Sequence, residues 1–172
     1  LAPYREDIER ADARALPLED ASADFVFIDP PYSTHLKYSD DPDCIGRLPA
    51  HTFDYYSAMD LVFAEIDRVL KPGRFMALYV SDSRHNKQAF SPIGFRLFSM
   101  LEQRFTPVDI IAVVRRNRTL KRGRFHTEAE KGNFFLRGFN YLIIMKKDAA
   151  PAAAAQPSRR AKRVRRKPSR TK

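Results

Sequence analysis

Short apolar runs alternate along the chain with longer segments whose apolar residues recur every three or four positions. Residues 23–29 (ADFVFID) and 74–82 (RFMALYVSD) are continuous apolar runs, which are typical of strands buried on both faces of a sheet. Between them, residues 54–70 carry apolar side chains at helical spacing. The sequence KPG at residues 71–73 is expected to stop that helix.

The same alternation continues in the second half. Ser91 followed by Pro92 predicts a helix N-cap with proline in the first turn, and the helix runs through Leu101. Residues 108–116 and 139–147 predict two further strands, joined by a long basic connection. Alternating strands and helices predict an α/β fold with a parallel, doubly wound sheet. Ligands of such sheets bind beyond the carboxyl ends of the strands, which places residues 29–32 and 81–82 on one rim.

Length and composition limit the class of protein. The 172 residues suffice for about one domain, and no run of about twenty apolar residues predicts a membrane span. The single cysteine, Cys44, excludes an internal disulfide, fits a reducing cytoplasm and is expected to be a small buried residue. The four histidines show no metal-ligand spacing with it, so no metal site is predicted.

Positive charge is concentrated at the carboxyl end. Residues 148–172 hold nine of the 31 Lys and Arg residues and one of the 21 acidic residues. Their Ala/Pro spacing and lack of large apolar side chains predict a disordered basic tail behind a body of residues 1–147. Such a tail fits sequence-independent contact with a polyphosphate, and a solubilising terminus is the alternative.

The first apolar run ends on the tetrapeptide DPPY, Asp29-Pro30-Pro31-Tyr32. An aspartate and two prolines can simply end a strand, with Tyr32 covering the edge of the core. In this context, however, with RVLKPGR and two closing strands after it, the motif resembles class I S-adenosylmethionine-dependent amino-methyltransferases. Among these it resembles the DNA N-4 cytosine/N-6 adenine methylases. The resemblance implies a Rossmann-like sheet, mostly parallel with an antiparallel last strand, and S-adenosyl-L-methionine as cofactor.

The chemistry of a base amine explains these residue types. Its lone pair is delocalised into the ring, so acceptors at the N–H groups are needed to localise that pair for methyl transfer. Asp29 offers a carboxylate to one N–H, and the Pro30 carbonyl, fixed by the prolines, offers an acceptor to the other. Tyr32 can stack on the face of a base that has left the duplex.

The cofactor half is represented only in part. Asp12 and Ala13 in ADARALP match the segment that contacts the cofactor's adenine in this family, and a solvated turn acid is the alternative for Asp12. The resemblance also makes Asp29 a candidate cofactor-binding residue. The first strand with its glycine-rich loop, and the acid that binds the ribose, are missing. We therefore expect a sheet that is incomplete at its amino end and a cofactor-binding half upstream, on a longer chain or a separate subunit.

Nucleic-acid contacts are predicted in two segments. RRNRTLKRGRFH, residues 115–126, has six basic residues and no acid, although a solvated charge run is the alternative. Residues 33–51 are a candidate lid over the site, with His35, Lys37 and Tyr38 facing the target strand. The candidate nucleic-acid-binding residues are Tyr32, Lys37, Arg115, Arg116, Arg118, Lys121, Arg122 and Arg124.

The sequence therefore predicts a cytoplasmic, nucleoid-associated methyltransferase that acts on an exocyclic amine in DNA. Aspartate as the first motif residue favours adenine N6 over cytosine N4 by family resemblance. One alternative is an RNA or tRNA base N-methyltransferase. The other is a catalytically inactive, basic nucleic-acid-binding remnant.

Overall fold

The computed structural model describes residues 8–32, 38–83, 90–116 and 123–149. The elements in chain order are β1 (Ala23–Ile28), η1 (Ile45–Arg47), α1 (Phe53–Val69), β2 (Leu70–Val80), α2 (Ile93–Leu101), β3 (Thr106–Val114), α3 (Gly123–Lys131) and β4 (Phe139–Lys146).

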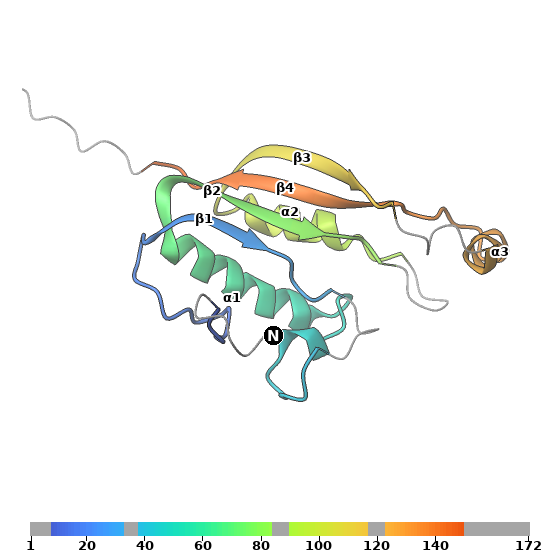
Figure 1. The fold of residues 1–172 in the computed structure, drawn as a ribbon, viewed down its shortest axis with the longest axis horizontal. Coiled ribbons are helices and arrows are strands. Elements are labelled where there is room, and N and C mark those ends of the chain that lie inside the picture. Colours follow the sequence, from blue (N-terminus) through green and yellow to red (C-terminus); the bar gives the residue numbers. More distant parts are fainter. Residues whose placement is uncertain (1–7, 33–37, 84–89, 117–122, 150–172) are drawn as a thin grey trace, which may run out of the picture.

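Four strands form one sheet in the order β1-β2-β4-β3 (Figure 1). β1 and β2 are parallel, whereas β4 is antiparallel to both of its neighbours, β2 and β3. Three strands therefore run in the same direction and the last strand of the chain runs against them. This confirms the predicted mostly parallel sheet with an antiparallel last strand.

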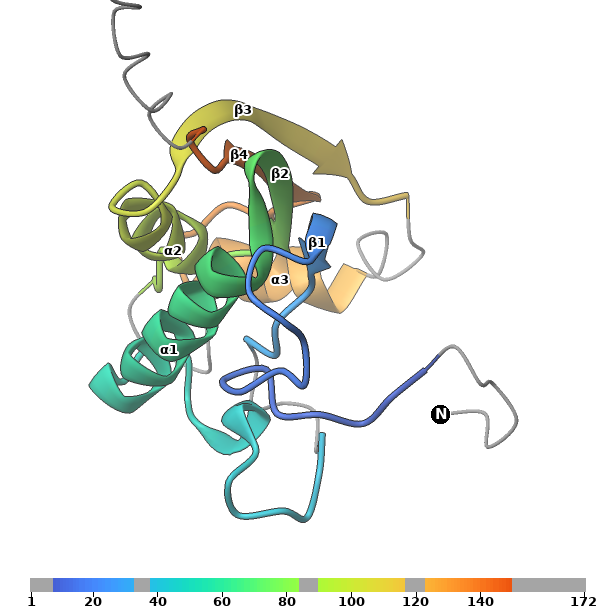
Figure 2. The same ribbon diagram turned by 90° about the vertical axis from the view of Figure 1, so that its left-hand side faces the viewer.

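The helices α1 and α2 cover the same face of the sheet (Figures 1 and 2). The core lies between them and the strands, because inward side chains of α1 and α2 meet those of β2 and β4. Its fully buried members include Phe63 and Leu97 from the helices and Met76, Leu78 and Met145 from the strands. The helical spacing of apolar residues in the sequence thus faces the alternating apolar residues of the strands.

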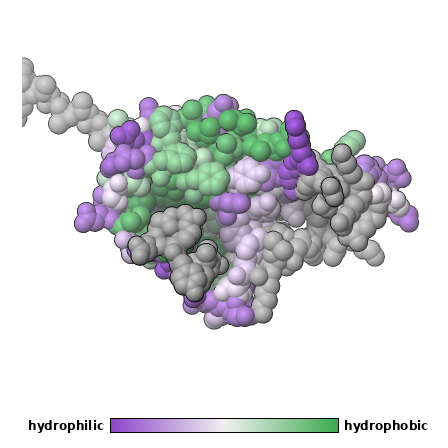
Figure 3. Space-filling view, viewed as in Figure 1, coloured by the Kyte–Doolittle hydropathy of each residue, from purple (hydrophilic) through white to green (hydrophobic). Residues whose placement is uncertain are grey.

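The opposite face of the sheet is uncovered in the described part of the chain. Phe25 and Phe27 of β1 are 57% and 56% exposed, so the prediction that this strand is buried on both faces was wrong. Strand pairing and alternation place further apolar side chains on the same face, which we call the open face. The open face consists of Phe25, Phe27, Phe75, Ala77, Tyr79, Ile111, Leu142 and Ile144. Apolar surface gathers over the strands in the space-filling view (Figure 3).

Two element boundaries differ from the sequence prediction. α1 ends at Val69, but Lys71 to Gly73 lie inside β2 and do not form a loop; Gly73 adopts φ 77° and donates its N–H to the Lys147 carbonyl. Ser91 does not cap α2, whose N-cap position is Pro92 without a side-chain hydrogen bond. Neighbouring residues did not predict these two boundaries, because the backbone N–H groups there are satisfied by partners distant in the sequence.

The connection between β3 and β4 contains α3, a helix that the sequence analysis did not predict. It lies beyond the end of β3, away from the other helices (Figure 1). The predicted basic tail from residue 150 onward lies outside the described residues, as do His35, Lys37, Arg118, Lys121 and Arg122. No helix within the described residues is long and apolar enough to cross a membrane, and these residues contain no metal-ligand cluster.

Candidate active site

The DPPY tetrapeptide directly follows β1 at the carboxyl end of the strand. Asp29 is exposed and therefore reachable, whereas Pro30 is buried and Pro31 and Tyr32 are half-buried. Partial burial raises the pKa of the Asp29 carboxyl above its usual value. The motif thus presents one accessible carboxylate on a proline-fixed turn.

Tyr32 connects this motif to the rest of the rim. Its ring packs against the hydrophobic core, which is compatible with the structural role that the sequence left open. Burial raises the pKa of the Tyr32 hydroxyl, the negative charge of Asp29 adds to this, and the positive charge of Arg115 opposes it. Tyr32 therefore lies within electrostatic reach of both Asp29 and Arg115.

Tyr38 forms a second aromatic wall near the motif. Burial and the Asp29 charge raise the pKa of its hydroxyl. Its ring lies so close to Gly46 that a Cβ there would stand 2.7 Å from the ring. Gly46 is therefore required for this packing, which holds the described end of the candidate lid in place.

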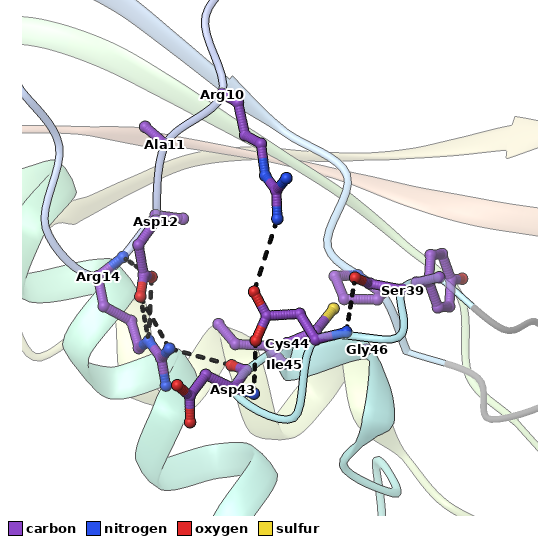
Figure 4. A pocket seen from close by; sticks show the side chains of 13 residues that line it. Arg10, Ala11, Asp12, Arg14, Ser39, Asp43, Cys44, Ile45 and Gly46 are labelled. Carbon is purple, nitrogen blue, oxygen red and sulfur yellow. Dashed lines mark hydrogen bonds and ion pairs between the residues drawn. The ribbon is translucent and has the colours of Figure 1, made fainter.

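A cavity of about 650 Å³ lies between the residue 10–14 turn and the residue 38–46 segment (Figure 4). Pro31 and Tyr38 line it together with Asp12 and Ala13, so the cavity reaches from one residue of the DPPY turn to two of the cofactor candidates. Cys44 also lines it and is only partly buried, contrary to the prediction of a buried residue.

Asp12 is held in place by its own turn. Arg14 donates its backbone N–H at 2.9 Å and its guanidinium at 2.8–3.1 Å to the Asp12 carboxylate. These hydrogen bonds lower the pKa of Asp12. The carboxylate stays ionised and keeps accepting capacity, and Ala13 leaves space beside it. These residues fit the adenine end of a nucleoside cofactor.

Arg68 of α1 fixes the segment between this turn and β1. Its guanidinium donates to the carbonyls of Leu16 and Leu18 and forms ion pairs of 2.6 Å with Asp20 and Glu65. The distance between the Asp12 turn and the DPPY turn is therefore set by the first helix after the motif.

Asp82, predicted to lie on the ligand rim, makes hydrogen bonds that stabilise the fold. Its carboxylate accepts the Tyr141 hydroxyl at 2.9 Å and the Gly94 N–H at the start of α2, also at 2.9 Å. Burial, followed by this hydrogen bond, raises the pKa of Tyr141 to about 12. Asp82 thus provides the cap that was expected from Ser91.

Replacing Asp82 with alanine is expected to lower the free energy of unfolding by about 2–3 kcal/mol, because two partly buried donors lose a charged acceptor. Asp82→Asn retains one acceptor oxygen, so its loss should be about half as large. Urea unfolding of both variants measures this. Equal stabilities of Asp82→Ala and wild type would contradict the assigned role.

The basic candidates after β3 differ from one another. Arg115 donates to the Ser81 hydroxyl at 3.1 Å and is half-buried, whereas Arg116 is exposed. Arg124 lies in α3, but its side chain is outside the described part. Of the predicted nucleic-acid-binding residues after β3, Arg116 is thus accessible to solvent, whereas Arg115 is hydrogen-bonded to the rim.

Two buried polar residues near the rim were missed by sequence reasoning. Asn140 is 4% exposed and Tyr55 is 0% exposed, yet the Asn140 Oδ1 and the Tyr55 hydroxyl lack hydrogen-bond partners in the described part. The signal for Asn140 was present, because an amide stands alone in the apolar run FNYLIIM.

Comparison with known proteins decides the family. The N6_N4_Mtase family model, described as DNA methylase, matches residues 23–172. The chain belongs to this DNA methylase family. The resemblance inferred from DPPY is thereby confirmed. No curated protein matches the chain.

Solved structures support the fold of this DNA methylase chain. A protein from Thermus thermophilus, described as a candidate DNA modification methylase, is 21% identical with a TM-score of 0.56, over 84% of this chain and 54% of that one. The same protein complexed with S-adenosyl-L-methionine is 18% identical with a TM-score of 0.55, over 84% of this chain and 56% of that one. The cytosine-N4-specific PvuII DNA methyltransferase is 16% identical with a TM-score of 0.55, over 78% of this chain and 46% of that one. The chain thus spans about half the length of these proteins.

Proposed function

We propose that this methylase chain carries the catalytic half of an enzyme that transfers a methyl group from S-adenosyl-L-methionine to an exocyclic amine in DNA. Adenine N6 is the favoured target and cytosine N4 the second. The observation that carries the proposal is that Pro31 of the DPPY turn lines the same cavity as Asp12 and Ala13. Membership of the DNA methylase family supports DNA as the substrate.

The residues of this chain act on the amine. When bound, S-adenosyl-L-methionine supplies a methyl group on a positively charged sulfur. Asp29 accepts one amine N–H, and the turn that Pro30 and Pro31 fix offers a backbone carbonyl for the other. These acceptors hold the nitrogen in the orientation that exposes its lone pair, so the contribution is positioning and electrostatics.

Asp29 also suits the removal of the amine proton. Its raised pKa makes it a stronger base than a fully hydrated aspartate, and its exposure leaves a route for the proton to water. Tyr32 presents a ring beside this carboxylate, where it stacks on a base that has left the duplex.

The open face supports the proposal that a cofactor-binding half packs on this chain. Mostly parallel sheets are normally covered on both faces, and here the phenylalanines of β1 lie uncovered at the sheet edge. β1 is also an edge strand whose outer backbone groups can pair with a further strand. We place the glycine-rich loop and the ribose-binding acid on that half, since Asp12 and Ala13 are proposed to contact only the adenine end of the cofactor.

Transfer of a labelled methyl group tests the function directly. The chain, together with its cofactor-binding half, is incubated with S-adenosyl-L-methionine and with duplex DNA or tRNA, and the labelled nucleosides are separated. N6-methyladenine or N4-methylcytosine in DNA is the expected product. Label in tRNA alone would indicate the RNA enzyme, and cofactor binding without transfer to either would indicate an inactive nucleic-acid-binding protein.

A further inference from the structure

A row of polar residues crosses the carboxyl rim of the sheet next to the DPPY turn. Asp29, Ser81 and Arg115 are the first residues after β1, β2 and β3, three strands that run in the same direction. Asn140 is the second residue of the antiparallel β4 and pairs with Val113. The topology thus brings four residues that are far apart in the sequence to one edge, and we call them the rim row.

The rim row continues the open face. Asn140 alternates with Leu142 and Ile144, and Tyr79 precedes Ser81 by two positions on β2. Arg115 Nη2 donates to the Ser81 hydroxyl at 3.1 Å and contacts the Phe139 carbonyl at 3.4 Å, so the guanidinium lies across β2 and β4. Its charge also reaches Tyr32 of the catalytic turn.

Two atoms of the rim row are buried without partners in the described part. Asn140 is 4% exposed and its Oδ1 accepts no hydrogen bond, while the Nε–H of Arg115 donates none. A buried unsatisfied polar group costs about 1–3 kcal/mol, so folded proteins rarely retain one without a use. The edge of the sheet that carries Asp29 therefore also carries one acceptor and one donor without partners.

The edges of the bases differ in whether they match this pair. Adenine and cytosine present an amine N–H next to a ring nitrogen that accepts, which is one donor beside one acceptor. Guanine and thymine present the reverse order on the same edge, a carbonyl beside a ring N–H. Asn140 Oδ1 complements the amine and Arg115 Nε–H complements the ring nitrogen of the first two bases only.

We infer that Asn140 and Arg115 read the edge of the target base and select adenine or cytosine over guanine or thymine. The inference rests on the proposed function and adds its specificity-determining residues. The amine hydrogen that meets Asn140 can be shared with the Pro30 carbonyl, since one N–H often serves two acceptors. Ser81 is a positioning residue, because its hydroxyl orients the guanidinium of Arg115.

Nuclear magnetic resonance of the isotope-labelled chain tests the inference without catalysis. Single-stranded oligonucleotides of deoxyadenosine, deoxycytidine and thymidine of equal length carry equal phosphate charge and differ only in the base. The Asn140 side-chain amide and the Arg115 Nε–H resonances are expected to shift with at least one of the first two and not with oligothymidine. Equal shifts with all three, or no shift with any, would overturn the inference.

Variants separate reading of the base from stability. Asn140→Leu removes the unpaired amide at similar size, so the melting temperature should be unchanged or higher. The kcat/KM for the amine-bearing base should nevertheless fall by about 5- to 150-fold, the range for one good base contact. Arg115→Lys keeps the charge but lacks the Nε–H donor and should show a similar fall. Arg74→Lys, at the opposite end of β2, is the matched control with unchanged kinetics.

The base-reading role and the proposed function can be contradicted separately. If wild-type protein methylates DNA and Asn140→Leu does so with unchanged rate and base selectivity, the base-reading role is wrong and the proposed function stands. If wild-type protein transfers no methyl group to any nucleic acid, the proposed function is wrong. The resonance shifts then still decide whether the rim row distinguishes bases.

Discussion

Methyl transfer is expected to fall about 100- to 1,000-fold when Asp29 is replaced with alanine, the loss found when one preorganised charge-stabilising contact is removed. The reason is that the amine then lacks its charged acceptor, while Tyr32 and the rim remain in place. Asp29→Asn keeps a neutral acceptor oxygen and should lose less. Single-turnover transfer and nucleic-acid binding, measured in parallel, separate the chemical step from affinity, which should stay within a few-fold of wild type.

The pH dependence provides a second measurement of the same role. Burial raises the pKa of Asp29 above its usual value of 3.8, so the acid limb of the rate profile should lie above that pH. The folded state then binds this proton more tightly than the unfolded chain does, so Asp29 makes the fold less stable as pH rises through that interval. Asp29→Asn should consequently be no less stable at neutral pH. Wild-type turnover in Asp29→Ala would show that the site is assigned incorrectly.

Replacing Phe27 with aspartate is expected to weaken association of the chain with the proposed cofactor-binding half at least about 100-fold. Covering one phenylalanine is worth about 1.5–3 kcal/mol, and a carboxylate buried without a partner adds a further cost. Phe27 is 56% exposed in the chain and stacks on Tyr79, so the fold of the chain itself should tolerate the change. Binding of S-adenosyl-L-methionine by calorimetry, with both halves present, is the readout.

The matched control for this experiment is Phe53→Asp. Phe53 is 84% exposed at the start of α1, on the helical side of the sheet, and an acid there suits the helix N-terminus. The control should leave cofactor affinity unchanged. If Phe27→Asp binds cofactor as tightly as Phe53→Asp, the open face is not where that half packs.

The site is therefore best understood as a composite built on one rim. In the proposed function, Asp29 accepts the hydrogen bond of the base amine, and Asp12 and Ala13, which line the cavity, contact the adenine of the cofactor. The uncovered phenylalanines mark the surface on which the remainder is proposed to assemble. Separate loss of function through Asp29 and Phe27 would show that chemistry and assembly occupy adjacent but distinct surfaces.

The sequence predicted the strands and the two long helices well because their apolar residues recur with the period of each element. It predicted β4 as Phe139 to Lys147, one residue longer than observed. It failed where a distant partner decides the local structure, as with Ser91, whose capping role is filled by Asp82. It also missed α3, whose residues lack a core-facing apolar stripe and lie in a run of charges.

By itself, the sequence determined that an aspartate follows an apolar strand on a rigid proline turn. The DPPY motif, together with the elements that follow it in order, was enough to indicate an amino-methyltransferase. Tertiary structure alone decided which residues meet that turn. Pairing of β4 between β2 and β3 is what brings Asn140 and Arg115 to the Asp29 rim from more than 80 residues away in sequence. Whether a face is covered likewise depends on the placement of both helices, which no local pattern specifies, so the open face emerged only from the fold.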